Sequence, residues 1–505
     1  MLICVLSCIL AITGCFFLLL TQRVLRTFGP VTFAQILIHI NMPRELVPDD
    51  FFKRLLNTGW KSYLVLALLL LYCLFNFLLC NNAFSLHCSH ILQVCLETLT
   101  LFKLSIFLHT RLQVVLFFIS FLLFILSLLY CMFKLDILGS LLARRRTSQL
   151  IDEFYADNNL NDFKLVNKKG KPLETLDKPN LILIVSESLE STFSNSSLFK
   201  ENLLRELTDY QRTENHINDL HMVRGCECTI TALYAIQYGL PILYFSSYNG
   251  DPLAKNPFRK NCFSVFDVLN ANGYSTTHIQ GSMLRFASTD VLFKSITNAK
   301  IRGLEDFPQE LYSSRHKWGL WDSDLFEAAK AEITELRTNG LPFALSLSTM
   351  DTHFDNVLQP GNESKYNGDM RDIIRLQSRL IDKFIKWVQQ SEFGTNTVIV
   401  ILGDHNMMTE KIGNINLASE DSRRIFNVIL NSKAKSKIPI DRHAAMFDIA
   451  PTILEAMGFD WPSQSLGIGR SLYGKQPTIL EKYGLKVWDK EAQKSSPKYM
   501  RIISP

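Results

Sequence analysis

Long apolar stretches occupy the chain before about residue 135. Residues 2–20, 63–80 and 114–133 carry no charge, and each is close to the roughly 20 residues that a membrane-spanning helix needs. Residues 2–20 resemble a signal peptide less well, because no basic segment precedes them and no A-x-A cleavage site follows. A fourth stretch, 89–109, contains Glu97 and Lys103 and is either an interfacial helix or, as we predict, a further span.

The pattern therefore predicts a multi-pass transmembrane region of about four helices over residues 1–135. Its orientation follows from the basic residues, because cytoplasmic loops carry an excess of Lys and Arg. The segment between the first two predicted spans is the richest in them and is expected in the cytoplasm. Four spans then place the rest of the chain outside the cytoplasm. The run Arg144–Arg146 argues the other way, but it precedes a large exported domain and carries less weight.

After a polar linker, 136–180, the pattern changes to short apolar runs that alternate with amphipathic segments. The run LILIV, 181–185, is typical of a strand that is buried on both faces. Three similar runs follow it, and helical patterns lie between them. The predicted strands are 181–185, 343–347, 398–402 and 426–430, and the predicted helices are 265–272, 322–336, 370–390 and 446–457. This alternation predicts an α/β domain over 181–475. It would contain a mostly parallel sheet with helices on both faces, and a tail, 476–505, follows it.

Polar residues stand where three of these strands end. Ser186-Glu187-Ser188 follows the first run, Asp351-Thr352-His353 the second and Asp404-His405-Asn406 the third. Because ligands gather at the carboxyl ends of parallel strands, these side chains are expected to converge on one crevice. Glu, Asp and His are ligands suited to Zn²⁺ or Mn²⁺. A single Asp-His pair after a strand is more often a turn, but three such ends favour a site for one divalent metal ion.

Thr229 is the candidate nucleophile. It begins an apolar helical pattern that runs to Tyr238 and is stopped by Gly239 and Pro241. A Thr at this place is usually an N-cap. The same place suits a nucleophile, because a helix N-terminus favours both an alkoxide and an arriving phosphate.

Composition adds two limits. The net charge is only +5 and is dispersed, which argues against binding to nucleic acid. Of eleven Cys, eight lie in or beside the apolar region, which leaves Cys226, Cys228 and Cys262. Outside the cytoplasm one of the first two could form a disulfide with Cys262.

These residues carry a resemblance to a known family. The chain resembles the lipoteichoic acid synthase and phosphoglycerol transferase branch of the alkaline phosphatase/sulfatase superfamily, which also includes phosphoethanolamine transferases of lipopolysaccharide. The likeness covers about 180–475 in the expected order. The matching text is LILIVSESLESTF (181–193), GCECTITALYAIQYGLPI (225–242), THIQGSMLRFASTDVLFKS (277–295), KWGLWDSDLF (317–326), STMDTHFDN (348–356), VIVILGDHN (398–406), FDIAPTILEAMG (447–458) and GIGRSL (467–472).

The resemblance implies roles for individual residues. One divalent metal, Zn or Mn, would be held by Glu187, Asp404, His405 and the nucleophile Thr229. His353 would contact the transferred phosphate or protonate a leaving oxygen. Arg285 and Trp318 look like residues on the substrate side, and so does Gln280. Related enzymes have His at the position of Gln280. We do not substitute His278 for it, because we expect His278 on the opposite face of its strand.

Ordinary structural roles are expected for the other polar residues of these segments. Asp322 and Asp324 are typical charges at a helix N-terminus. Asp448 is expected to cap a helix, and His443 to be a surface or shell histidine rather than a ligand. Ser186 and Ser188 lack the G-x-S-x-G context of a nucleophile.

Together these features predict a transferase in the inner membrane of a bacterium, with its catalytic domain in the periplasm. It would move phosphoethanolamine or phosphoglycerol from a membrane phospholipid to an envelope saccharide, such as a lipopolysaccharide or lipooligosaccharide core or a periplasmic glucan. A phospho-threonine would be the intermediate. The alternatives are a membrane-anchored phosphodiesterase or sulfatase-type hydrolase and a non-catalytic scaffold. A sulfatase is disfavoured, because neither Cys226 nor Cys228 begins a C-x-P-x-R motif.

Overall fold

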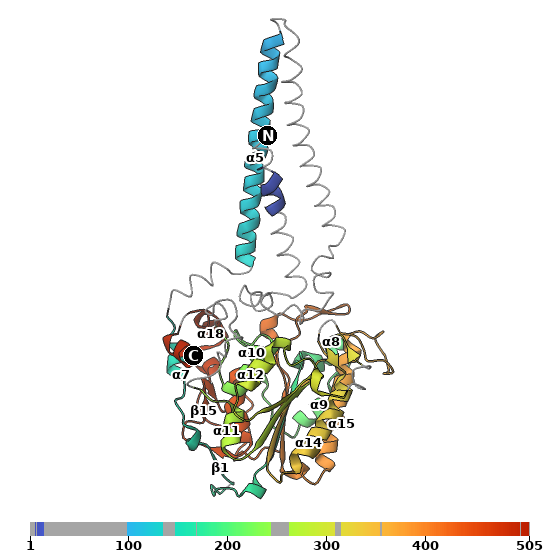
Figure 1. The fold of residues 1–505 in the computed structure, drawn as a ribbon, viewed down its shortest axis with the longest axis vertical. Coiled ribbons are helices and arrows are strands. Elements are labelled where there is room, and N and C mark those ends of the chain that lie inside the picture. Colours follow the sequence, from blue (N-terminus) through green and yellow to red (C-terminus); the bar gives the residue numbers. More distant parts are fainter. Residues whose placement is uncertain are drawn as a thin grey trace. The chain divides into compact units, whose positions relative to one another are not determined.

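The structure is a computed structural model that describes residues 6, 8–14, 98–134, 147–167, 169–243, 262–308, 315–353, 356–494 and 496–503. The chain divides into two compact units, with the boundary between Leu141 and Leu142. The first contains the long helix α5 (Thr98–Lys134), and the second contains the α/β domain (Figure 1).

Helix α5 corrects the prediction for the membrane region. It has 37 residues, about 55 Å of helix, and it runs without a break through 98–109 and 114–133, which we predicted as parts of two separate spans. No Gly or Pro lies between Thr110 and Gln113 to interrupt the helix. Within the described part of the chain, Val114–Phe133 is the one stretch long and apolar enough to cross a membrane, so a multi-pass region is not supported. The predicted span 63–80 and most of 2–20 lie outside the described residues.

A six-stranded sheet forms the centre of the α/β domain. Its strand order is β12-β9-β2-β8-β4-β5. The strands β2, β4, β5, β8 and β9 are parallel, and β12 pairs antiparallel with β9 at one edge. The strand bounds are β2 Asn180–Ser186, β4 Ser275–Gln280, β5 Lys300–Arg302, β8 Phe343–Ser348, β9 Thr397–Gly403 and β12 Asn427–Leu430.

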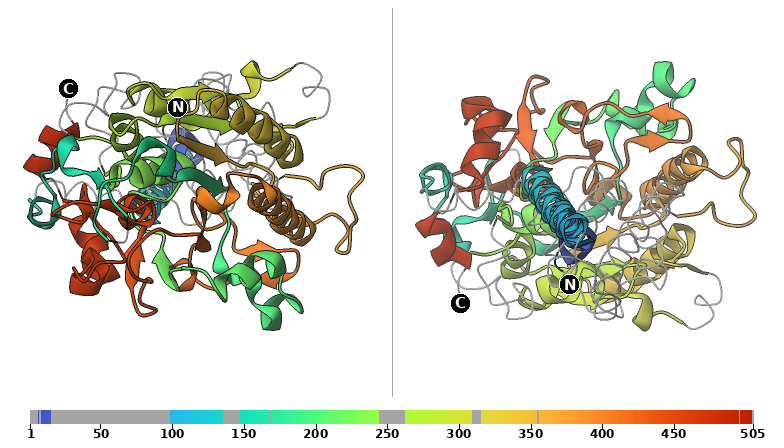
Figure 2. Two further views of the ribbon diagram at one scale, coloured as in Figure 1. Left: turned by 90° about the horizontal axis from the view of Figure 1, so that it is seen from below. Right: turned by 90° about the horizontal axis from the view of Figure 1, so that it is seen from above.

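Strand β2 shows why its sequence is apolar throughout. Leu181, Leu183 and Val185 pack into one core cluster, while Ile182 and Ile184 pack into the other, because successive side chains point to opposite faces. Helices cover both faces. The first cluster includes α10 (Thr229–Tyr238), α11 (Val265–Ala271) and α16 (Ile449–Ala456), and the second includes α9 (Arg205–Gln211), α14 (Asp322–Arg337) and α15 (Met370–Gln390). Figures 1 and 2 show α10 and α11 on one side of the sheet and α14 and α15 on the other.

The predicted α/β fold class is confirmed, and each predicted strand and helix of the domain has a counterpart within a few residues. Strand β4 was not among the four strands predicted from apolar runs, because its sequence STTHIQ contains one aliphatic residue, although a strand was expected at His278. Its side chains are nevertheless buried, since Thr277 and His278 find hydrogen-bond partners inside the protein.

Most of the described residues after 478 are helical, and they join the core. They form α17 (Ile479–Tyr483), α18 (Leu485–Glu491) and α19 (Pro497–Ile503). Trp488 and Tyr499 are fully buried. The Trp488 indole N–H donates to the carbonyl of Arg224, and the Tyr499 hydroxyl donates to the carbonyl of Pro241. These bonds attach the C-terminal helices to the two segments that flank α10.

Candidate metal centre

Three predicted metal ligands meet at the carboxyl edge of the sheet. Strands β2 and β9 are parallel neighbours with Ser186 opposite Gly403, so the residues that follow them emerge side by side. Glu187, Asp404 and His405 are buried there, and one possible ligand atom from each lies within 4.8 Å of the others. The Nε2 atom of His405 is 3.5 Å from Glu187 Oε1 and 3.4 Å from Asp404 Oδ2.

Hydrogen bonds fix which atoms of these side chains face one another. Asp404 Oδ1 accepts the backbone N–H groups of Ser188 and His405, both at 2.8 Å, which leaves Oδ2 directed at the cluster. His405 Nδ1 is 2.9 Å from the carbonyl oxygen of Asn406. A carbonyl oxygen only accepts, so Nδ1 carries the proton and the lone pair of the neutral ring is on Nε2. This tautomer is the one a metal ligand requires.

The cluster is well suited to a cation. Burial and the neighbouring Glu187 carboxylate raise the pKa of Asp404 to about 6, because two buried anions repel each other. A divalent ion between them would remove that repulsion. Asn406 directly follows His405, and its side-chain amide is buried without a hydrogen-bond partner among the described residues. Its oxygen and nitrogen are therefore available to a polar ligand. Burial, donor set and tautomer all fit one divalent metal ion.

Thr229 is the first residue of α10, and its hydroxyl is not used as the helix cap. The residue before it, Cys228, is the N-cap, and Thr231 completes the cap by accepting the Cys228 N–H at 3.0 Å. The Thr229 hydroxyl instead donates to Glu187 Oε2 at 3.4 Å. The structure therefore brings the predicted nucleophile to the predicted metal ligands at the start of a ten-residue helix.

The segment after β8 approaches the same cluster. Thr352 donates its hydroxyl to the carbonyl oxygen of Glu187, and Thr349 accepts the Glu187 N–H at 3.2 Å. Asp322, at the start of α14, accepts the backbone N–H groups of Met350 and Asp351 at 2.8 and 3.0 Å. Asp322 is thus a first-turn residue of a helix, as predicted, and it also holds the loop that carries His353.

His353 lies against Trp318, with ring centroids 4.1 Å apart. Phe286 also contacts Trp318, in an edge-to-face arrangement with the ring centroids 5.8 Å apart. The structure thus brings His353, the predicted phosphate-contacting residue, against Trp318, a predicted substrate-side residue. Arg285, which is exposed, is adjacent in sequence to Phe286, a neighbour of Trp318.

Gln280 is directed into its own loop. Its amide group donates to Ser282 Oγ at 3.1 Å and to the carbonyl of Met283 at 2.7 Å, and these bonds hold the turn that leads to Arg285. The expected placement of His278 is wrong. Residues two apart on a strand share a face, and His278 Nε2 is 3.4 Å from Gln280 Oε1. The His278 ring stacks on Phe293 in the core, where burial lowers its pKa to about 3.

Sequence reasoning missed two backbone features that shape the centre. Ser188 adopts a left-handed conformation, φ 52°, and donates its hydroxyl to Glu187 Oε1 at 2.6 Å. Gly403 lies so close to the next segment that a Cβ atom would come within 1.9 Å of the Leu189 carbonyl oxygen. The Gly before Asp404 was a visible signal for such a close approach.

Cys226, Cys228 and Cys262 are free thiols, so the disulfide we considered is absent.

Comparison with known proteins shows to which family the chain belongs. The sulfatase family model matches residues 179–459, more than half of the chain. The chain belongs to the sulfatase family. This confirms the superfamily that the sequence motifs indicated. The match includes β2, α10 and β9, and with them every residue of the candidate metal centre.

Curated relatives of this sulfatase-family chain are named phosphoglycerol transferase I. Those of Escherichia fergusonii and Shigella flexneri are each 28% identical over 357 residues, which is 68% of this chain and 45% of the relative. The chain thus spans about half the length of the curated relatives it matches.

Solved structures share the fold. A protein of the alkaline phosphatase superfamily from Vibrio parahaemolyticus aligns with TM-score 0.51 and 19% identity over 66% of this chain and 80% of its own. The integral membrane protein lipooligosaccharide phosphoethanolamine transferase A of Neisseria meningitidis aligns with TM-score 0.50 and 12% identity over 90% and 87%. These likenesses show an alkaline-phosphatase-like α/β fold.

Proposed function

We propose that the chain is a metal-dependent phosphotransferase that moves a phospholipid head group, phosphoglycerol or phosphoethanolamine, onto an envelope saccharide. One observation carries the proposal: the Thr229 hydroxyl, free of any capping role, lies 3.4 Å from Glu187 beside Asp404 and His405. The name of the curated relatives, phosphoglycerol transferase I, supports the class of reaction.

Glu187, Asp404, His405 and Thr229 would hold one divalent ion, Zn²⁺ or Mn²⁺. Such an ion, when bound, lowers the pKa of a coordinated hydroxyl and offsets charge on a phosphoryl oxygen. The chain's own contribution is positioning. Its buried acidic groups and the N-terminal N–H groups of α10 bring the hydroxyl and an anionic substrate to one point.

In the first half-reaction the Thr229 hydroxyl loses its proton to solvent, and its oxygen forms a bond to phosphorus as the bond from phosphorus to the diacylglycerol oxygen breaks. The departing oxygen needs a proton, and His353, beside Trp318, is the residue we assign to supply it. The products are diacylglycerol and a phospho-Thr229 diester that carries the head group.

In the second half-reaction an acceptor hydroxyl gives its proton to His353, which lost one in the first half-reaction, and attacks the same phosphorus atom. The bond to Thr229 breaks and its oxygen takes up a proton from solvent, which restores the enzyme. Phosphoryl transfer relies mainly on positioning and on charge stabilisation. We assign Arg285 and Trp318 to contact the head group or the acceptor, and Gln280 to support them, because it holds the turn that leads to Arg285.

A lipid donor agrees with the candidate span Val114–Phe133, which gives the chain an apolar helix for the bilayer. We propose that this helix lies in the inner membrane and that the α/β domain is periplasmic, where envelope saccharides are available. A hydrolase that uses water in the second half-reaction is the nearest alternative. Both enzymes would release diacylglycerol, so the fate of the head group distinguishes them.

The proposal is tested with full-length protein in vesicles that contain phosphatidylglycerol or phosphatidylethanolamine with a radiolabelled head group. Wild type should release diacylglycerol and carry the label on Thr229, as tandem mass spectrometry of a quenched sample would show. Thr229→Ala should lose at least about a thousandfold in rate, since the nucleophile is missing. Thr213→Ala, an exposed threonine outside the centre, is the matched control and should keep full activity.

Normal turnover by Thr229→Ala would remove this residue from the mechanism. Label that appears only as a soluble head group, even when periplasmic glucan or lipooligosaccharide is supplied, would indicate the hydrolase. If the wild-type protein binds metal but releases no diacylglycerol from either lipid, the proposed phospholipid donor is wrong. If it neither binds metal nor releases diacylglycerol, the chain is a non-catalytic scaffold.

A further inference from the structure

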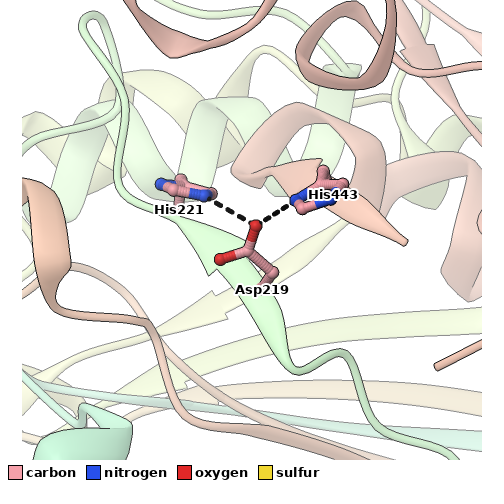
Figure 3. Close-up of side chains that lie close together, drawn as sticks. All are labelled: Asp219, His221 and His443. Atoms are coloured by element: carbon pink, nitrogen blue, oxygen red, sulfur yellow. Dashed lines mark hydrogen bonds and ion pairs between the residues drawn. The ribbon is translucent and has the colours of Figure 1, made fainter. Parts of the chain in front are cut away.

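A second group of potential metal ligands lies outside the candidate metal centre. It is formed where β3 (Asp219–His221) pairs in parallel with β13 (His443–Ala445). The register places His443 opposite Asp219, and His221 shares a face with Asp219 because the two are two residues apart. Three side chains from two distant segments therefore converge on one point (Figure 3).

Both imidazole rings face the same carboxylate oxygen. Asp219 Oδ2 is 3.0 Å from His221 Nε2 and also contacts His443 Nδ1, as the two dashed lines in Figure 3 show. The other oxygen, Oδ1, is bound by the Arg424 guanidinium. One ligand atom from each of the three residues lies within 4.8 Å of the others.

The surrounding hydrogen bonds hold this geometry in place. The backbone N–H of His443 donates to Glu481, and its carbonyl accepts the Thr478 hydroxyl. On the other strand, the Leu220 carbonyl accepts the N–H of Ile425. Because the ligands are already fixed, metal binding would cost little conformational entropy.

The Arg424 guanidinium lies beside this group, but it contacts only Oδ1 of Asp219. Its charge opposes a second cation, while its contact orients the carboxylate so that Oδ2 faces the two imidazole rings. Imidazole nitrogens and a carboxylate oxygen are donors that zinc sites use.

We propose that Asp219, His221 and His443 bind a divalent transition-metal ion, with Zn²⁺ the best match to two imidazoles and one carboxylate. Three protein ligands leave a fourth position for water. The exposure of the ligands agrees with this, since the His443 side chain is 58% accessible and the His221 side chain 10%. The ion can enter from solvent on the His443 side.

The position in the fold indicates what the ion would do. β3 continues through Met222 toward Thr229, and Met222 Sδ accepts the N–H of Asn406, the residue after His405. β13 continues into Met446–Asp448, which packs on α10. A metal that joins β3 to β13 would therefore stabilise the two segments that support α10 and the first centre. Without a metal, the same three residues would join β3 to β13 by hydrogen bonds alone.

The number of zinc ions bound per full-length protein distinguishes a metal site from a cluster that is only hydrogen-bonded. The protein is equilibrated with Zn²⁺, freed of unbound ion and measured by inductively coupled plasma mass spectrometry. Wild type should hold two Zn²⁺, and His443→Ala and Glu187→Gln should each hold one. The double variant should hold none. His216→Ala, a histidine just before β3 and outside the cluster, is the matched control and should hold two.

Thermal unfolding gives a second readout that does not depend on activity. In the Glu187→Gln variant, Zn²⁺ should raise the melting temperature by several degrees, and His443→Ala should abolish this rise. Because His443 is exposed, its replacement alone should alter folding little. The proposal is overturned if His443→Ala retains as much zinc as wild type, or if Zn²⁺ leaves the melting temperature of Glu187→Gln unchanged.

Discussion

At the scale of single residues, the two oxygens of Asp404 have different partners. Oδ1 accepts two backbone N–H groups, which fixes the side chain, and Oδ2 faces His405 and the Glu187 side of the cluster. The same division recurs at Asp219, where Arg424 holds one oxygen and two histidines face the other. A carboxylate that is anchored in this way presents one lone pair at a defined place, which is the property that a metal ligand needs.

The raised pKa of Asp404 predicts a pH dependence. In the metal-free folded protein the pKa of Asp404 is about 6, above the ordinary value of 3.8 for an Asp. Protons therefore compete with the metal for this carboxylate. Between these two values the metal-free folded protein binds more protons than the unfolded chain, so its stability falls as pH rises through this window. Metal binding should accordingly weaken as pH falls below about 6.

The measurement is the rise in melting temperature caused by Mn²⁺ or Zn²⁺, recorded in the His443→Ala variant to isolate the first centre. The rise should be larger at pH 7 than at pH 5. Asp404→Asn should abolish it at both values, and Asp382→Asn, which alters a carboxylate remote from the cluster, should leave it intact. A rise that is equal at pH 5 and pH 7 would contradict the assignment of Asp404 as a ligand.

At this scale the sequence allowed part of the centre to be predicted. Glu187, Asp404 and His405 follow apolar strands, and that pattern alone placed them together. The strain at Ser188 could not be seen, because a Ser with φ 52° has no sequence signature. Neither could the inward direction of Gln280, which depends on bonds to Ser282 and Met283 in the folded loop.

At the scale of elements, the close approach of β9 to the segment after β2 sets the position of the ligands. Leu189 N–H bonds to the Ser186 carbonyl, which makes a tight turn around Glu187, and Gly403 lies against this turn. Asp404 N–H then donates to the Ser186 carbonyl as well. The two strand ends are therefore coupled through backbone contacts, and any side chain at position 403 would separate them.

Gly403→Ala should destabilise the domain by roughly 2 kcal/mol or more, because its Cβ atom would meet the Leu189 carbonyl oxygen at 1.9 Å. Gly340→Ala is the control. Its φ of +64° strains an Ala, but no atom lies within 4 Å of the added Cβ, so the expected loss is about 1 kcal/mol. Denaturant unfolding measures both. Equal losses for the two variants would show that the contact at Gly403 relaxes easily.

Among the elements, apolar strands and amphipathic helices were predictable, since their periods are visible in the sequence. The break between the predicted spans 89–109 and 114–133 was wrong, because polar residues within an apolar stretch do not by themselves end a helix. The helical nature of 479–503 was missed, as its short helices gain their stability from burial of Trp488 and Tyr499.

At the scale of the whole molecule, the chain combines a helix that fits a bilayer with a domain that carries all residues of the candidate centre. The α/β unit has two large core clusters of its own, one on each face of the sheet. Its stability should therefore not depend on α5. The proposed donor is a lipid, so the expected contribution of the apolar part is access to substrate.

Residues 147–505 expressed without the preceding segment should unfold in one cooperative transition and bind the same number of metal ions as the full chain. Transfer from vesicles should fall by at least tenfold, because the enzyme no longer resides at the donor surface. Transfer from a short-chain phospholipid dispersed below its critical micelle concentration should be nearly retained. Equal loss on both donors would mean that the apolar segment contributes to the centre itself.

The central claim is that Glu187, Asp404, His405 and Thr229 surround one ion. It is tested most directly by anomalous X-ray scattering from crystals grown with Mn²⁺ and recorded above and below the Mn absorption edge. The account predicts an anomalous peak within coordination distance of an oxygen of Glu187, Asp404 Oδ2, His405 Nε2 and the Thr229 hydroxyl oxygen. A map with no peak at this position, or with a peak beyond reach of Thr229, would contradict it.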